Sequence, residues 1–201
     1  MNTLMYKPEG MPTQNAESRE YYYSPQALEK AAATGRILEG IVTLCDSELS
    51  LHVDLGTMKG KIRKEEALLS LSGEEVKDIA VITRVGKPVA FKIIGFEMDG
   101  NEKIAILSRR AAQKDCLENY LMTLIPGDII DARVTHLEPF GAFVDIGVHQ
   151  DGLVHISQIT NKFIRHPSEV LSVGDGVKVV VLEVDEKKKR ISLSIKQVKN
   201  T

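Results

Sequence analysis

Hydrophobic and polar residues alternate in short runs along most of this chain, and the runs form two sets. The first set closes with PVAFKIIGFE at 88–97 and KIAILS at 103–108, and the second with GVKVVVLEVD at 176–185 and RISLSI at 190–195. Short runs with a period of two, rich in β-branched residues and bounded by turn residues, predict β-strands. We therefore expect about five strands in each half of the chain.

The two sets belong to two copies of one repeated unit. Residues 35–67, GRILEGIVTLCDSELSLHVDLGTMKGKIRKEEA, align with residues 127–159, GDIIDARVTHLEPFGAFVDIGVHQDGLVHISQI, with small gaps. Short strands, Gly-rich turns and an excursion of about 20 residues after the third strand are typical of a small closed Greek-key barrel of the OB type. The predicted fold class is all-β, with two five-stranded OB-type barrels joined by a helix and with a short N-terminal helix.

Two segments have helical instead of alternating patterns. Ser24 followed by Pro25 fits a helix N-cap with proline at the first helical position, and Gly35 ends that helix. Residues 108–125, SRRAAQKDCLENYLMTLI, have helical propensity and end before Pro126. The predicted organisation is an N-terminal arm and short helix in 1–33, a divergent first barrel in 34–109, a connecting helix in 110–123 and a second barrel in 124–198.

The beginning of the chain lacks a periodic apolar pattern. Residues 1–20 are polar and contain prolines and a glycine, which favours a flexible arm that can still dock elsewhere. The run Tyr21–Tyr23 follows. We expect one or two of these rings to pack on the adjacent domain, and stacking on nucleic-acid bases is the alternative.

Charge and cysteine content limit the function classes. The 201 residues include 26 Lys and Arg against 28 Asp and Glu, for a formal net charge of -2, so a nucleic-acid site would have to be local. There is no secretory signal pattern and no apolar run near the roughly 18 residues that span a bilayer. We expect a cytoplasmic protein without a membrane partner. Cys45 and Cys116 lack a C-x-x-C partner, which favours reduced thiols over a zinc site or a disulfide framework.

Strand alternation in the second unit separates a core face from an outer face. Alternate residues of a strand point to opposite sides of the sheet. The set predicted to point inward is aliphatic: Ala142, Val144 and Ile146 from GAFVDIG, and Val154 and Ile156 from GLVHIS. The set predicted to point outward is Phe143 and Asp145 from the first of these strands, and Leu153, His155 and Ser157 from the second.

Three rings are predicted to gather on that outer face. A hairpin centred near His149 would place His155 opposite Phe143, with Cβ atoms about 5 Å apart. Phe140 lies just before the strand, where a turn lets its ring reach the same patch. An exposed aromatic cluster is usually kept for a partner, and stacking on a ring contributes about 1 to 3 kcal/mol per base.

Cations are predicted near these rings. The turn DEKKKR, residues 185–190, contains Lys187, Lys188, Lys189 and Arg190. Asp185 could orient Arg190 or accept a hydrogen bond from a base or a ribose hydroxyl. In the loop NKFIRHPSE, Lys162, Arg165 and His166 are weaker candidates for contacts with a nucleic-acid backbone.

Residues 124–198 resemble the S1-type RNA-binding domain, through PGDIIDARVTHLEPFGAFVDIG, DGLVHIS and GVKVVVLEVDEKKKRISLSIK. The resemblance implies an OB barrel that binds single-stranded RNA on the face of its second and third strands. It places the family's aromatic pair on Phe140 and Phe143, its histidine on His155, and its last-hairpin aspartate and arginine on Asp185 and Arg190. The two-repeat layout resembles short ribosomal protein S1 homologues of low-GC Gram-positive bacteria, which implies association with the ribosome.

The first repeat keeps the core pattern but not the rings. His52 stands where the second copy has Phe143, and Arg63 replaces His155. His52, Lys61 and Arg63 are expected to form a polar, partly basic outer face that can hold phosphate or bind protein. Weak assistance in RNA binding and a protein contact rank equally, and a purely structural role ranks behind both.

These observations predict a non-enzymatic protein that binds single-stranded RNA, either mRNA or rRNA, through Phe140, Phe143, His155, Asp185, Arg190, Lys188, Lys189 and Lys162 of the second repeat. The alternative is an adaptor that docks on the ribosome or the transcription machinery, which the ring-free first repeat and the net charge of -2 favour. No catalytic triad, phosphate-binding loop or pair of carboxylates in a cleft is apparent, and no metal or cofactor is expected. His136, His149 and His166 are scattered and are interpreted as surface residues.

Overall fold

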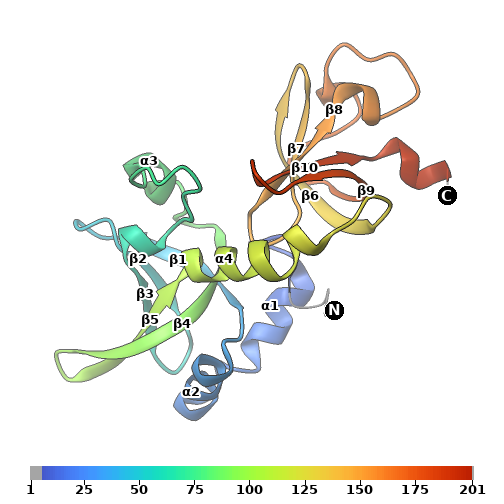
Figure 1. Cartoon of the computed structure of the whole chain (residues 1–201). Coiled ribbons are helices and arrows are strands. Elements are labelled where there is room, and N and C mark those ends of the chain that lie inside the picture. Colours follow the sequence, from blue (N-terminus) through green and yellow to red (C-terminus); the bar gives the residue numbers. More distant parts are fainter. Residues whose placement is uncertain (1–5, 201) are drawn as a thin grey trace. The chain divides into compact units, whose positions relative to one another are not determined.

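The computed structural model describes residues 6–200, and within them the side chains of all residues except 12–15 and 199–200. The chain divides into two compact units within its helix α4 (Arg109–Asn119), between Asp115 and Cys116. One unit runs from Glu9 to Asp115, and the other combines the chain from Cys116 onward with the segment before Glu9. Each unit contains one barrel (Figure 1).

Both barrels have five strands and the same topology, which confirms the predicted fold class. The first contains β1 (Leu38–Cys45), β2 (Leu51–Asp54), β3 (Lys59–Ile62), β4 (Pro88–Asp99) and β5 (Glu102–Ser108), and the second contains β6 (Ile129–Glu138), β7 (Gly141–Asp145), β8 (Asp151–His155), β9 (Gly176–Asp185) and β10 (Arg190–Ser194). The strand orders are β1-β2-β3-β5-β4 and β6-β7-β8-β10-β9, and each sheet closes on itself. The pairs β3–β5 and β8–β10 are parallel and the other pairs are antiparallel.

Helices and turns fill the connections. The α-helices are α1 (Pro12–Arg19), α2 (Pro25–Thr34), α3 (Asp78–Ile82) and α4 (Arg109–Asn119). The short 3-10 helices are η1 (Lys64–Glu66), η2 (Leu121–Thr123), η3 (Ile156–Gln158), η4 (Pro167–Glu169) and η5 (Lys196–Asn200). Among the residues described, no helix is both long enough and apolar enough to cross a membrane.

The barrel cores come from the inward alternation of the strands. Ala142, Val144, Ile146 and Val154 are buried, as the alternation predicts. Ile156 is an exception, because β8 ends at His155 and Ile156 opens the 3-10 helix η3, where its side chain is only half-buried. The prediction that Ile156 points inward as a strand residue was therefore wrong. The outward placement of Asp145 was also wrong, because its side chain is buried and accepts a hydrogen bond from the Gly147 amide at 2.9 Å.

The two barrels share a glycine at the equivalent position of their third strands, where a core leucine packs against it. A Cβ on Gly60 of β3 would lie 2.5 Å from Cδ1 of Leu107, and a Cβ on Gly152 of β8 would lie 2.5 Å from Cδ1 of Leu193. Both distances are too short for real carbon atoms, so each position admits only glycine unless the leucine moves. The third strand of each barrel therefore has a glycine where a core leucine of the fifth strand packs.

The N-terminal segment from Glu9 onward is docked on the first barrel, which corrects the expectation of a flexible arm. The buried Glu9 carboxylate accepts hydrogen bonds from Nη2 of Arg109 at 2.6 Å, from Nε of Arg109 at 2.9 Å and from the Ala90 amide at 2.7 Å. The Tyr22 hydroxyl donates to the Glu39 carbonyl at 2.5 Å. The polar segment that contains α1 is therefore held on the first barrel by the buried ion pair of Glu9 and by hydrogen bonds to Glu39, including one from the Gly10 amide to its carboxylate at 2.6 Å.

The tyrosine run packs partly, as predicted. Tyr21 and Tyr22 lie against the first core, whereas Tyr23 is exposed. Burial, together with the charge of Glu39, raises the pKa of Tyr22 well above its usual range. Tyr22 is therefore held as a neutral hydrogen-bond donor.

Candidate nucleic-acid interface

The β7–β8 hairpin sets the positions of the predicted site residues, and its register differs from the prediction. Phe143 pairs with Leu153, and His155 pairs with Gly141. The expectation that Phe143 faces His155 directly was therefore wrong. Because the register differs by two residues, Phe143 and His155 keep the same face of the sheet and become diagonal neighbours.

The turn itself explains the difference. Val148 and His149 have φ values of 49° and 59°, in the left-handed region. The Gln150 amide donates to the Gly147 carbonyl at 3.0 Å, and the Val148 amide donates to the Lys7 carbonyl at 2.9 Å. These bonds centre the hairpin on Val148, one residue before the expected centre.

Gly141 is required where β7 crosses close to β8. A Cβ on Gly141 would lie 2.3 Å from the Val154 carbonyl oxygen and 3.1 Å from Cα of His155. Only glycine allows backbones to approach this closely. The position paired with His155 therefore carries no side chain.

A cluster of three aromatic rings does form on the outer face of the second barrel, but its third member is His136. The Phe140 and Phe143 ring centroids lie 6.0 Å apart with an interplanar angle of 89°, and the His136 and Phe143 centroids lie 6.0 Å apart with an angle of 32°. Phe140 is 49% exposed and the His136 side chain is 60% exposed. We call His136, Phe140 and Phe143 the ring cluster.

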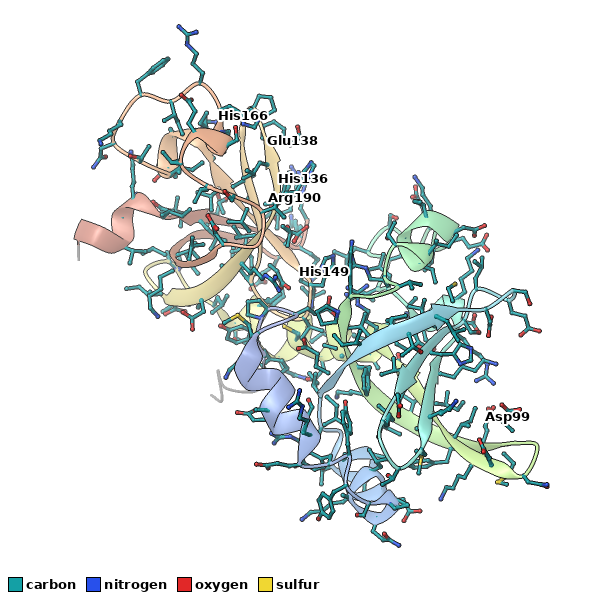
Figure 2. All side chains as sticks on the ribbon, turned by 180° about the vertical axis from the view of Figure 1, so that it is seen from behind. Asp99, His136, Glu138, His149, His166 and Arg190 are labelled. Atoms are coloured by element: carbon teal, nitrogen blue, oxygen red, sulfur yellow. The ribbon has the colours of Figure 1, made fainter. Side chains whose placement is uncertain are left out.

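A β-bulge brings His136 to this face. Strict alternation would place His136 on the same inward side as Val134, but the β6–β7 register shifts between Val134 and His136, so that His136 pairs with Phe143. Bulges re-aim side chains in this way. The sequence reading missed His136 because no residue in THLEPF marks the bulge. The His136 Nε2 lies 2.5 Å from a carboxylate oxygen of Glu138, which orients the ring (Figure 2).

The partners of Phe143 extend across the barrel in one row. In register, the row consists of His136, Phe143, Leu153 and Ser192, from β6, β7, β8 and β10. Leu153 is half-buried, so an apolar side chain lies beside the Phe143 ring. The row offers a flat, partly apolar surface with polar ends, which suits a stacked base.

His155 is exposed and its orientation is fixed by the turn that follows. Its Nδ1 accepts a hydrogen bond from the Ser157 amide at 3.2 Å and lies 2.8 Å from the Ser157 hydroxyl. An Nδ1 that accepts from an amide must be unprotonated in neutral imidazole, so Nε2 carries the hydrogen. His155 thus presents a donor beside the ring cluster instead of a third stacked ring.

The basic turn between β9 and β10 is shaped by Asp185. One oxygen of its carboxylate accepts hydrogen bonds from the Lys187 and Lys188 amides, each at 3.1 Å, and Lys189 has a φ of 55°. Asp185 therefore holds the turn. All four cations of the turn, Lys187, Lys188, Lys189 and Arg190, are exposed.

Arg190 lies on the outer side of β10, two residues before Ser192, whereas Ile191 and Leu193 between and after them are buried. Since Ser192 pairs with Leu153, Arg190 borders the same face as the ring cluster. Lys162 is different, because it lies in the excursion after η3 and not on the strands.

The first-barrel candidates are engaged with acidic side chains. Nε2 of His52 lies 2.8 Å from the Asp46 carboxylate, and Nη2 of Arg63 lies 2.8 Å from the Glu97 carboxylate. The hydrogen bond from His52 holds the pKa of Asp46 below its usual value. His52 pairs in register with Lys61, so these two side chains share a face as predicted. The acids offset the positive charge that a phosphate would need.

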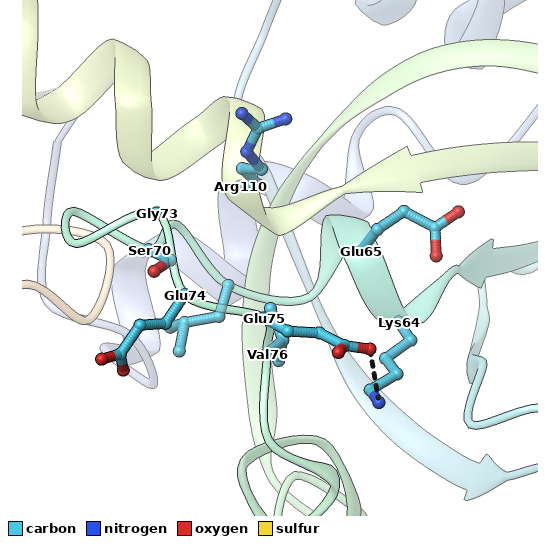
Figure 3. A pocket seen from close by; sticks show the side chains of 9 residues that line it. Lys64, Glu65, Ser70, Gly73, Glu74, Glu75, Val76 and Arg110 are labelled. Atoms are coloured by element: carbon cyan, nitrogen blue, oxygen red, sulfur yellow. Dashed lines mark ion pairs between the residues drawn. The ribbon is translucent and has the colours of Figure 1, made fainter.

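The first unit also has a pocket of about 310 Å³ with several carboxylates on its wall, which the sequence reading did not find. Its charged lining residues are Lys64, Glu65, Glu74, Glu75 and Arg110 (Figure 3). The Lys64 ammonium lies 3.6 Å from the Glu75 carboxylate and 2.7 Å from that of Asp78. The Glu75 side chain is 90% exposed. Such solvated, ion-paired carboxylates line a surface loop and disfavour an anionic ligand.

Two further points concern ligand-binding residues. Cys45 and Cys116 are both thiols and not half-cystines. Within the described part of the chain, no group of three or more His, Cys, Asp and Glu side chains is placed to hold a metal ion.

Comparisons with known proteins agree with this geometry. The family model for the S1 RNA binding domain matches residues 123–196. Small ribosomal subunit protein bS1 of Mycobacterium leprae is 34% identical over 85% of this chain, and the matched region is 33% of that relative. The bS1 homolog of Bacillus subtilis is 36% identical over 88% of this chain and is covered over 44% of its length.

A third relative, Protein YhgF of Escherichia coli, is 59% identical over 36% of this chain and 9% of its own length. The chain thus spans less than half of the length of these curated relatives. The second barrel therefore matches the S1 RNA binding domain family, and the chain is similar over most of its length to part of ribosomal protein bS1.

Proposed function

We propose that this chain is a non-enzymatic protein that binds single-stranded RNA, mRNA or rRNA, through the outer face of the second barrel. The observation that carries the proposal is the ring cluster, in which the exposed Phe140 and the half-buried Phe143 lie edge to face on the outer side of the sheet. Solvent-accessible rings on an OB barrel with cations on the same face are what a base-stacking surface requires. The proposed domain limits remain 34–109 and 124–198.

In the proposed mechanism, a base stacks on Phe143 against Leu153, and the next base lies against Phe140. The fixed Nε2–H of His155 donates to a base, ribose or phosphate oxygen. Arg190 and the exposed lysines of the β9–β10 turn neutralise phosphates. Because every base has a π-face, little sequence preference is expected.

The names of the relatives support a role in translation. The similarity to bS1 extends over both barrels, so we propose that the chain acts in the cytoplasm on ribosome-associated RNA. The whole length of those relatives is not represented, and the proposal concerns only the repeats that the chain contains.

A second function is proposed for the first barrel, as a protein contact. Its excursion between β3 and β4 exposes Leu71, Ile79 and Ile82. Its two basic candidates, His52 and Arg63, are paired with acidic side chains. Exposed aliphatic groups with balanced charge suit a protein partner better than phosphates. The adaptor function is thus proposed alongside RNA binding, on a separate barrel.

The decisive experiment is a titration of labelled single-stranded RNA, and of matching DNA, with the full chain and its Phe143→Ala variant. We expect a loss of about 1 to 3 kcal/mol of binding free energy with a nearly unchanged salt slope, since a stacked base is lost and no phosphate contact is. Phe143→Tyr keeps the ring and is the matched control, expected to retain affinity. Equal affinity of Phe143→Ala and wild type would refute the stacking proposal.

Arg190→Ala tests the electrostatic contribution of the proposed contacts with RNA phosphates. The variant should lower affinity and flatten the dependence of log K on log salt by about 0.7, the value for one phosphate contact on a single strand. Arg190→Lys keeps the charge and should preserve the slope. A slope that is unchanged in Arg190→Ala would place the phosphate contact elsewhere.

A further inference from the structure

The excursion between β8 and β9 exposes one aromatic side chain to an unusual degree. Phe163 is 88% exposed, more than any other large hydrophobic side chain of the described residues. An exposed phenylalanine is costly, because its apolar surface remains in water. A solvent-exposed ring in an ordered loop is accessible to a partner, and the residues around it indicate which kind of partner it suits.

The loop around Phe163 is held in place by its own hydrogen bonds. The Glu169 carboxylate accepts from the Arg165 amide at 2.6 Å and from the His166 amide at 3.0 Å, and Nδ1 of His166 accepts from the Ser168 amide at 3.1 Å. Pro167 is buried. The ring is thus presented by a built turn and not by a chain without internal bonds.

Positive charge flanks the ring. Lys162 and Arg165 are exposed, and within the described residues neither side chain forms an ion pair. Glu169, the acid nearest in sequence, is occupied by backbone amides. A cavity of about 480 Å³ at the base of the excursion has Lys162 and Lys196 on its wall. A ring between uncompensated cations matches nucleic acid better than an apolar protein surface.

The excursion is continuous with the ring cluster. The Ile156 amide, at the start of η3, donates to the Phe140 carbonyl at 2.8 Å, and η4 packs against β6. The turn that carries Phe140 and the excursion lie at one end of the second barrel (Figure 1). A single-stranded RNA that extends past Phe140 at this end would therefore reach the excursion.

The equivalent excursion of the first barrel has a different character. It exposes Ile79 and Ile82 and pairs its Lys64 with Glu75 and Asp78. An aromatic ring with uncompensated cations is thus a property of the second barrel's excursion and not of the duplicated fold.

We propose that Phe163, with Lys162 and Arg165, is a second stacking site that binds the part of a single-stranded RNA extending beyond the ring cluster. The inference rests on the proposed function, which it extends from a short base-stacking surface to a longer path. RNA that reaches only the ring cluster does not need Phe163. The dependence on Phe163 should therefore appear only above a threshold of RNA length.

The test is a length series of oligouridylate, from about 3 to 12 nucleotides, within the range that OB folds cover. The full chain and Phe163→Ala are compared at each length. We expect equal affinity for the shortest oligonucleotides and a loss of about 5- to 150-fold for the longest, the fold-change that corresponds to one lost stack. Because Phe163 is so exposed, the variant should fold as wild type does, which circular dichroism would check.

Three matched variants sharpen the test. Phe163→Trp should keep the affinity for long RNA, and Phe163→Leu should lose it, because leucine is apolar but has no π-face. Val173→Ala changes another exposed apolar side chain of the same excursion, one without a ring, and should have no effect. The double variant Lys162→Ala with Arg165→Ala should lower the salt slope by up to about 1.4 for long RNA only.

The outcomes separate this inference from the proposed function. If Phe143→Ala weakens binding while Phe163→Ala leaves every length unchanged, the second site is overturned and Phe163 faces a protein partner instead. An equal loss at all lengths would also overturn it, since Phe163 would then belong to the primary site. If Phe143→Ala has no effect at any length, the proposed function itself fails.

Discussion

His136 and Phe143 are direct cross-strand partners, with ring centroids 6.0 Å apart and planes inclined by 32°. A β-bulge after Val134 creates this relationship. It adds a ring from β6 to a surface that the sequence assigned only to β7 and β8. The proposed binding face is thereby wider than the positions carried over from the family resemblance.

Replacing His136 tests whether this wider face is used. His136→Ala should weaken single-stranded RNA binding by about 1 kcal/mol, the lower end of the range for one stacked base, because the ring is tilted against Phe143. His136→Phe should restore affinity. His52→Ala removes a histidine that is likewise held by an acid, on the first barrel, and should not change RNA affinity measured by the same titration. A loss as large in His52→Ala would contradict the assignment.

Gly141 should not tolerate a side chain. Gly141→Ala would place Cβ 2.3 Å from the Val154 carbonyl oxygen, so the β7–β8 backbones must separate. We expect a cost of about 1 to 3 kcal/mol in the free energy of unfolding of the second unit, measured by urea denaturation. Gly176→Ala is the control, since nothing lies within 4 Å of its Cβ position; it should be neutral or slightly stabilising.

The buried ion pair between Glu9 and Arg109 should hold the N-terminal segment to the first barrel. Glu9→Ala leaves the Arg109 guanidinium buried without its carboxylate, which costs about 3 to 5 kcal/mol. Thermal and urea unfolding of the first unit should show this loss. Glu29→Ala removes the exposed pair of Glu29 with Lys103, whose atoms lie 2.7 Å apart, and should cost less than about 1 kcal/mol. Comparable losses in the two variants would show that the Glu9 pair is not buried in solution.

The order of the Phe163 excursion should depend on acid pH. Hydrogen bonds from the His166 and Arg165 amides hold the pKa of Glu169 below its usual value. A carboxyl group whose pKa is lowered in the folded state contributes stability above its unfolded pKa, and this contribution disappears as the pH falls through the folded pKa. Amide resonances of Arg165 and His166, followed by NMR, should therefore shift only at acid pH. Glu169→Gln, which cannot ionise, should abolish that transition, and a transition that persists would exclude Glu169 as its source.

The core of each barrel could be derived from the amino-acid pattern. The inward positions Ala142, Val144 and Val154 follow from a period of two, which is a property of the extended backbone and needs no knowledge of distant partners. The exposed cations of the 185–190 turn and the loss of rings in the first repeat were also visible in the residues themselves. These features depend on local geometry alone.

Three features required the folded chain. The hairpin register depended on the left-handed Val148 and His149, which are ordinary residues with no turn signal of their own. His136 reached the ring cluster through a bulge, because pairing between strands and not residue type decides where an extra residue is placed. Glu9 and Arg109 lie 100 positions apart in sequence and meet in a buried pair, and since a polar segment alone carries no signal for such a partner, only long-range packing could turn the predicted arm into a docked helix.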